Sequence, residues 1–172
     1  MQKEIEGWDQ VENLCAIEDW ITLSSYIASL SSQESSLIFS RLKPETQRSV
    51  LTHLDPENAA QLMELLDESV AVDALEELTP KEAASILYEV ESDEQADLIT
   101  ELDPEDAEAI LAEMPKDDAD SLRKLSAYPF DCAGGLMRSE FLAYSDQTTV
   151  GGIVSDFLAN REAYSGYHVQ YI

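Results

Sequence analysis

The chain has 172 residues, 44% of them hydrophobic, which is enough for one compact domain and a smaller additional segment. Its 36 Asp and Glu residues outnumber its 10 Lys and Arg residues, so the formal net charge is −26 and nucleic acid and anionic membranes are poor partners. No apolar run approaches the roughly 18 residues of a membrane span, and the N-terminus lacks the basic start and apolar core of a signal peptide.

Residues 8–30 are predicted to form one or two amphipathic helices, because their apolar residues recur at helical spacing. Trp8 and Trp20 lie on that apolar stripe. Two tryptophans could form a ligand cage, but a helical array needs an apolar cap at its end, and we assign them that role.

Residues 33–53 continue the helical pattern and gather the basic residues Arg41, Lys43 and Arg48. The next stretch, residues 54–126, has 23 acidic residues against four basic ones, so charge is polarised along the chain. The basic end would suit packing against an acidic surface, and surface ion pairs would explain it equally well.

An internal repeat of 12 residues dominates the chain from residue 42 to residue 125. Apolar residues follow each anchor at positions five, eight, nine and twelve, as in Ala83, Ile86, Leu87 and Val90 after Leu78. This is the i, i+3, i+4, i+7 spacing of one helical face. The anchors are Leu42, Leu54, Leu66, Leu78, Val90, Leu102 and Met114.

Each anchor is predicted to close one helix just before the next begins. Proline stands two places after most anchors, at the first helical position, and Asp55, Thr79 and Asp103 precede it as N-caps. The helices are then about nine to ten residues, or about 14 Å, long, which is too short to be stable alone. We therefore expect an all-α, superhelical, α-solenoid-like array of short helices with a 12-residue repeat.

The repeat ends at Leu125, and the remaining residues predict an incomplete α/β segment. Gly134 and Gly135 break any helix. A short strand is expected over Glu140–Tyr144, and Thr148 or Thr149 should cap a helix from about Val150 to Asn160. A second strand begins at Val169–Ile172, which leads us to expect that the chain is a fragment of a longer protein.

The sequence motifs of the chain do not favour an enzyme. His53 and His168 are isolated from cysteine or serine partners, and P-loop, GxSxG, HExxH and EF-hand patterns are absent from the sequence. Cys15 and Cys132 form no CxxC pair and suit a reduced cytosolic setting.

One repeat unit carries a distinctive set of acidic residues. Positions three, seven and eleven after an anchor lie opposite the apolar stripe, and only the unit after Val90 has carboxylates at all three, Asp93, Asp97 and Glu101. Carboxylates at i and i+4 repel one another, and Mg²⁺ can bind one or two carboxylates while keeping most of its waters. A magnesium site and a plain solvated helix face are both consistent with this spacing.

The segment from Tyr128 to Leu158, with AGGLM at Ala133–Met137, resembles the entry to the paired CBS domains of MgtE-type magnesium transporters. The helical repeats before it resemble the cytosolic N domain of that family. The resemblance implies an N domain over residues 1–127, and a junction and truncated first CBS domain over residues 128–172. It also implies a homodimer, with further CBS domains and a transmembrane pore in the same protein, and therefore the cytoplasmic region of an inner or plasma membrane protein.

Only a few of the family's magnesium-binding residues have counterparts in this sequence. The family pattern L-x-x-D-D-x-A-D resembles V-E-S-D-E-Q-A-D here, which places magnesium ligands on Asp93 and Asp97. A further family ligand falls near Gln61, so that role is either lost or taken by Glu57 or Glu64. Gly151 and Gly152 also depart from the family, and glycine weakens a helix by about 1 kcal/mol per residue.

Three functions follow from these observations. The first is the magnesium-sensing regulatory region of an MgtE-like transporter or channel, with Mg²⁺ bound between the acidic N domain and the CBS domains to gate the pore. The alternatives are a helical-repeat scaffold for protein interaction and a soluble CBS-domain regulator that senses adenine nucleotides.

Overall fold

The computed structural model describes residues 7–129, 131–139, 141–161 and 164. Within those residues the chain forms eleven α-helices of eight to ten residues each, close to the nine to ten residues that the repeat predicted. The helices are α1 (Gly7–Ala16), α2 (Trp20–Ser29), α3 (Ser32–Phe39), α4 (Pro44–His53), α5 (Pro56–Met63), α6 (Glu68–Glu76), α7 (Pro80–Leu87), α8 (Ser92–Glu101), α9 (Pro104–Glu113), α10 (Lys116–Leu125) and α11 (Val150–Ala159).

The predicted helix boundaries are largely confirmed. Asp55 and Thr79 cap α5 and α7, and Thr79 forms a capping box in which its hydroxyl accepts from the Glu82 N–H and the Glu82 carboxylate accepts from the Thr79 N–H. Asp103 occupies the equivalent position before α9 but makes no side-chain capping bond. Anchor residues end α4, α8 and α9, at Leu54, Leu102 and Met114.

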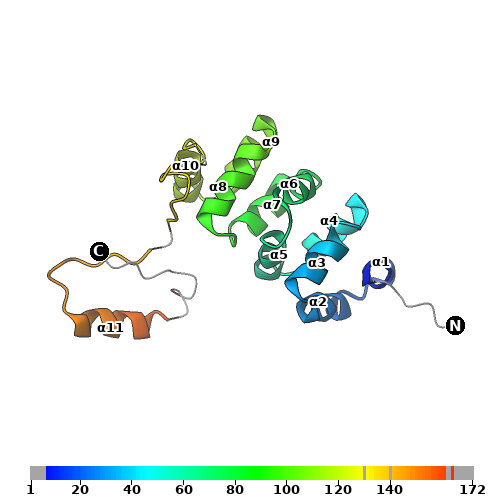
Figure 1. Ribbon diagram of the computed structural model, residues 1–172, viewed down its shortest axis with the longest axis horizontal. Helices are drawn as coiled ribbons and strands as arrows, with labels where there is room; N and C mark the ends of the chain where they lie inside the picture. The colour runs from blue at the N-terminus through cyan, green and yellow to red at the C-terminus, as the bar shows by residue number, and fades with distance from the viewer. Residues whose placement is uncertain (1–6, 130, 140, 162–163, 165–172) are drawn as a thin grey trace.

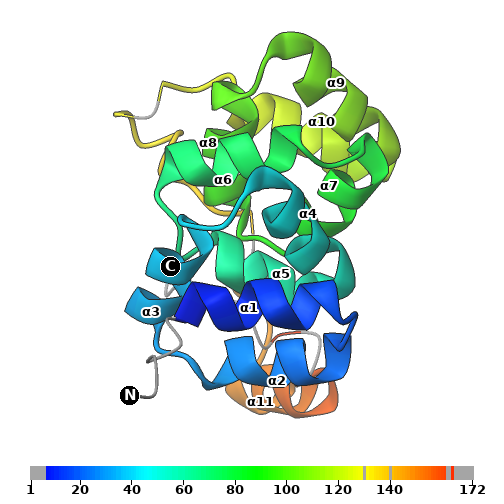
Figure 2. The ribbon, with the colours of Figure 1, turned by 90° about the vertical axis from the view of Figure 1, so that its right-hand side faces the viewer.

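Helices α1 to α10 stack into an elongated array that runs from α1 and α2 at one end to α9 and α10 at the other (Figure 1). From α5 onward, each helix packs mainly on a helix two places away along the chain, whereas α4 packs on α1, α5 and α6. One row contains α3, α5, α7 and α9, and the other contains α4, α6, α8 and α10. The sequence therefore repeats once per helix, whereas the packed unit contains two helices (Figure 2).

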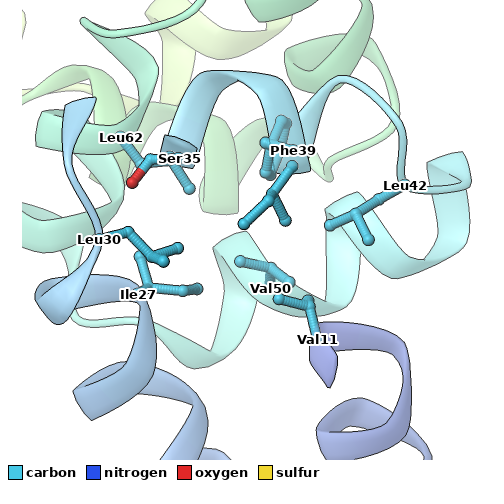
Figure 3. Close-up of a pocket in the computed structure, with 9 residues that line it drawn as sticks. Val11, Ile27, Leu30, Ser35, Phe39, Leu42, Val50 and Leu62 are labelled. Atoms are coloured by element: carbon cyan, nitrogen blue, oxygen red, sulfur yellow. The ribbon is translucent and has the colours of Figure 1, made fainter. Parts of the chain in front are cut away.

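The core occupies the space between these rows. All the apolar residues that the repeat placed on the inner face after Leu78 and Leu102 are buried, and so is every anchor except the half-buried Leu66. Near the N-terminal end the core retains a gap of only about 10 Å³, bordered by Val11, Leu30 and Phe39 (Figure 3). A gap of that size holds at most about one water, so this gap belongs to a packed core and is not a ligand pocket.

The N-terminal end is sealed by aromatic and basic side chains. Trp8 and Trp20 pack against the core, as predicted. The Arg41 guanidinium lies 4.5 Å from the Trp8 ring centroid, and His53 stacks on Trp20 at 3.6 Å between ring centroids. His53 is thus a packing residue, whereas His168 lies outside the described residues.

Two more basic residues of this end form ion pairs. Lys43 lies 3.9 Å from Glu12, and Arg48 lies 3.3 Å from Glu82. Of the two explanations for the polarised charge, surface ion pairing is therefore the one that these contacts support.

Helix α11 lies apart from the stack (Figure 1). Its predicted cap is confirmed, because Thr149 Oγ1 accepts from the Gly152 N–H at 3.1 Å. The strand expected over Glu140–Tyr144 does not form in its described part, where only Phe141 makes a bridge pairing. Tyr144 instead donates a side-chain hydrogen bond to Asp156 of α11 at 2.7 Å. Glu140 and the strand predicted at Val169–Ile172 lie outside the described residues.

Each helix in the described part of the chain is too short or too polar to cross a lipid bilayer.

Candidate cation site at the start of α8

Acidic side chains gather where α8 begins beside the end of α5. We call Glu64, Glu91, Asp93, Glu94 and Asp97 the α8 carboxylate cluster. Glu91 is the N-cap of α8, Asp93 and Glu94 follow in its first turn, and Glu64 is the C-cap of α5. A helix N-terminus favours acidic residues, so α8 tolerates this density of charge at its start.

Burial and mutual repulsion perturb three of these carboxyl groups. The pKa of Glu64 is raised first by burial and then by the charge of Glu91. Burial also raises the pKa of Glu94, with Glu64 and Asp93 adding repulsion. The cluster therefore holds more negative charge than its surroundings compensate.

Asp97 shows the repulsion along α8 that the i, i+4 spacing predicted. Its pKa is raised by burial, and next by the charges of Asp93 and Glu101 on either side. Asp97 and Glu101 are exposed, as an outward column requires. Asp93 departs from that prediction, because the segment after α10 covers it and leaves its side chain only 24% exposed.

That covering segment, residues 131–139, is called the junction segment. Arg138 binds two members of the cluster: its guanidinium lies 2.6 Å from Glu91 Oε2, and its Nε donates to Asp93 Oδ2 at 2.9 Å. The Ser139 N–H donates to the buried Ser92 Oγ at 2.8 Å. Two consecutive junction residues thus hold three consecutive residues at the start of α8.

A glycine in the junction segment allows this docking. A Cβ added to Gly134 would lie 2.5 Å from Cδ1 of Tyr128, so the turn can approach that ring only without a side chain. Within the turn, the N–H groups of Gly135 and Leu136 both donate to the Cys132 carbonyl. The AGGLM motif therefore forms a tight turn that returns Arg138 to α8.

Two hollows give solvent access to the cluster. One, of about 180 Å³, is bordered by Glu64, Glu68, Glu94 and Asp97. The other, of about 400 Å³, lies between α8, α10 and the junction segment, with Asp97 and Glu101 on its wall. Both have room for a hydrated ion beside carboxylate oxygens.

The chemistry of these donors fits a hard divalent cation. Asp93 Oδ1 is buried and has no hydrogen-bond partner, which leaves a carboxylate oxygen available to a ligand. Among the described residues, the three carboxylates whose oxygens all lie within 4.8 Å of one another belong elsewhere, to the exposed Glu76, Asp103 and Asp106. The α8 cluster is therefore a partial ligand set that suits an ion keeping most of its waters.

The structure brings some of the predicted ligands together and separates others. Asp93 and Asp97 belong to one cluster, Glu101 lies a turn further along α8, and Glu64 faces the cluster. Glu57 is exposed in the first turn of α5 and does not border either hollow. Whether these residues bind metal stays a prediction.

Sequence reasoning missed Glu91, Glu94, Glu68 and Arg138. Glu91 and Glu94 belong to the VESDEQAD run. The prediction took only positions three, seven and eleven after each anchor, and these two residues occupy other positions. Arg138 lies 45 residues from Asp93, beyond the repeat, so its position depends on a fold that the 12-residue period does not describe.

Comparisons with known proteins agree with this architecture. A family model described as the MgtE intracellular N domain matches residues 24–131. A crystal structure of the soluble part of a magnesium transporter is 20% identical and superposes with a TM-score of 0.75 over 90% of this chain and 61% of that one. The cytosolic domain of the Mg²⁺ channel MgtE in complex with ATP is 22% identical, with a TM-score of 0.77 over 94% of this chain and 67% of that one.

At these identities the two solved structures establish the fold alone. The chain spans about two thirds or less of the length of each. A search of curated proteins found no match.

Proposed function

Because the chain belongs to the family of the MgtE intracellular N domain, we propose that it is the magnesium-sensing regulatory region of an MgtE-like magnesium transporter or channel. That family is the cytosolic part of a transporter, in keeping with the prediction that the chain is not an enzyme. The observation that carries the proposal is the α8 carboxylate cluster, in which desolvation and neighbouring carboxylates raise the pKa values of Glu64, Glu94 and Asp97.

The proposed mechanism follows from the charge of the cluster. Asp93 and Asp97 would hold the cation, and Glu64 and Glu101 border the two hollows that meet Asp97. A bound magnesium ion supplies two positive charges that compensate carboxylates crowded together at the start of α8. Without that compensation, repulsion between the N domain and any acidic neighbour favours a separated arrangement, and this difference is what can shift a gate.

The domain assignment belongs to the same proposal. Residues 1–127 form the N domain, and residues 128–172 form the junction and the start of a first CBS domain, of which α11 is the first helix. The proposed partners are the remaining CBS domains and a transmembrane pore of the same protein, as a homodimer with this region on the cytoplasmic side. The family match and the fold support this assignment over residues 24–131.

The test measures magnesium flux in vesicles through the transporter that carries this chain. Magnesium on the cytoplasmic side should inhibit flux, and Asp93→Asn with Asp97→Asn should raise the inhibiting concentration about tenfold, because the cation loses both charged ligands. Asp117→Asn with Asp118→Asn, which removes two exposed charges from α10, is the matched control and should behave like the unaltered protein. Unchanged inhibition in the Asp93 and Asp97 variant would refute the proposal.

Adenine-nucleotide sensing is a second candidate, favoured by one comparison. The similar MgtE cytosolic domain was crystallised with ATP. If the protein senses nucleotide instead, ATP should shift its thermal midpoint in the absence of magnesium. A protein-interaction scaffold, the remaining alternative, should respond to neither ligand.

A further inference from the structure

The two hollows beside α8 adjoin each other. Glu68 of α6 and Asp97 of α8 border both the hollow of about 180 Å³ and the hollow of about 400 Å³. The smaller hollow continues to Glu64 and Glu94, and the larger one continues to Glu101. Together they form a trough along α8, which we call the α8 trough, with these five carboxylates on its walls.

The α8 trough carries uncompensated negative charge. Within the part of the chain that the structure describes, none of the five carboxylates forms an ion pair, and no lysine, arginine or histidine borders either hollow. Arg138, whose charge acts on two of the five, is itself paired with Glu91 and Asp93. Ser126, the C-cap of α10, borders the larger hollow and places the negative end of that helix dipole beside it. The trough is therefore suited to a cationic ligand.

Apolar side chains also line the α8 trough. They are Leu66, Ala71 and Leu98 in the smaller hollow and Leu125, Tyr128 and Pro129 in the larger one. Tyr128 is 49% exposed, which leaves much of its surface open to a ligand. A hydrated magnesium ion binds through oxygen atoms and water, so it gains nothing from these walls. Methylene groups gain from apolar burial, and an ammonium group gains from the face of an aromatic ring. The lining therefore favours an organic cation with an aliphatic chain.

We propose that the α8 trough binds linear aliphatic polyamines, which place their ammonium groups at the carboxylates and their methylene segments against the apolar walls. Asp97 and Glu101 are one helical turn apart, which separates their Cβ atoms by about 5–6 Å, similar to the spacing of ammonium groups joined by a few methylenes. A single basic side chain of a partner protein has one charge and would leave most of the five carboxylates unpaired. A polyamine extends through both hollows and offers several charges. This inference goes beyond the proposed function, with which it shares Glu64, Asp97 and Glu101.

The experiment titrates the linear tetra-amine spermine into the 172-residue chain by isothermal titration calorimetry at physiological ionic strength. Glu68→Gln with Glu101→Gln should weaken spermine binding about tenfold, because two partly screened ion pairs are lost. Glu105→Gln with Glu113→Gln removes the same charge from exposed positions on α9, outside the trough, and is the matched control. The control should change the affinity less than about twofold, because salt screens distant surface charges.

The aromatic wall gives a second readout, which a change of net charge would not affect. Tyr128→Leu keeps an apolar side chain but removes the ring, and should weaken spermine binding about two- to fivefold. Tyr128→Phe retains the ring and should bind spermine like the unaltered chain. Both variants should keep the magnesium affinity of the unaltered chain, because a hydrated ion makes no use of the ring.

The outcomes separate this inference from the proposed function. Equal weakening by the trough variant and the α9 control would reduce binding to attraction by net charge, and full affinity in Tyr128→Leu would remove the aromatic contact; either result overturns the inference. A lysine peptide of the same net charge that binds more tightly than spermine would assign the trough to a basic protein segment instead. Failure of spermine to bind would overturn the inference and leave the magnesium sensor intact. Spermine binding by a chain that does not respond to magnesium would sustain the inference and refute the proposed function.

Discussion

Asp93 pairs one carboxylate oxygen with Arg138 and buries the other without a partner. Sequence could select Asp93 and Asp97, because helical spacing fixes which residues share a face and the i, i+4 interval fixes their separation. The sequence could not predict the burial that raises the pKa of Glu64 and Glu94, because this burial depends on α5 ending beside the start of α8. Local periodicity therefore found the outward carboxylates, and tertiary packing added the others.

Glu64 allows the cost of this crowding to be measured. A carboxyl group whose pKa is raised in the folded state lowers stability once both states are ionised, and that penalty disappears as the pH falls below its ordinary value. Glu64→Gln should therefore increase the free energy of unfolding near neutral pH, by less than about 1 kcal/mol because the group is partly exposed. The gain should vanish below about pH 4, where Glu64 is protonated without any substitution.

The measurement is denaturant unfolding of both chains across that pH range. Glu57→Gln removes an equal charge from an exposed position on the same helix and serves as the control. If the Glu64→Gln effect is independent of pH, or matches that of the control, the ionised Glu64 carboxylate does not lower the free energy of unfolding.

At the scale of the helix, the helix boundaries were predictable because a few adjacent residues determine each one. Proline at the first helical position, a capping residue before it and an apolar anchor at the end recur in register with the 12-residue period. Pairing of each helix with the next but one was not predictable from that period, since every unit presents a similar apolar face to several possible neighbours. The expected strand at Glu140–Tyr144 failed in its described part for a related reason, because a strand depends on a partner elsewhere in the chain.

Thr79 and Asp103 test the capping argument as a pair. They occupy equivalent N-cap positions before α7 and α9, but only Thr79 forms side-chain capping bonds. Thr79→Ala should cost about 1 kcal/mol of unfolding free energy, whereas Asp103→Ala should cost only a few tenths. Urea denaturation of the two variants checks this, and equal losses would mean that the capping box adds nothing to α7.

At the scale of the whole molecule, an acidic stack of short helices contacts the following segment at the start of α8, through Arg138 and Ser139. The stack was predictable because its order is periodic and local, and the family match confirms it over residues 24–131. The contact with the following segment was not, because it joins residues 45 positions apart across the end of the repeat. The contact between α8 and the junction segment is therefore a property of the fold and not of any single motif.

The central claim is that Asp93 and Asp97 bind magnesium, and the thermal midpoint of the chain in millimolar magnesium at constant ionic strength tests it most directly. A tenfold excess of ligand over its dissociation constant stabilises a protein by about 1.4 kcal/mol, which predicts a rise of about 3 to 6 °C. Glu105→Gln with Glu113→Gln, a pair of exposed charges on α9, should retain that rise, and Asp93→Asn with Asp97→Asn should abolish it. An equal rise in the Asp93 and Asp97 variant would contradict the claim.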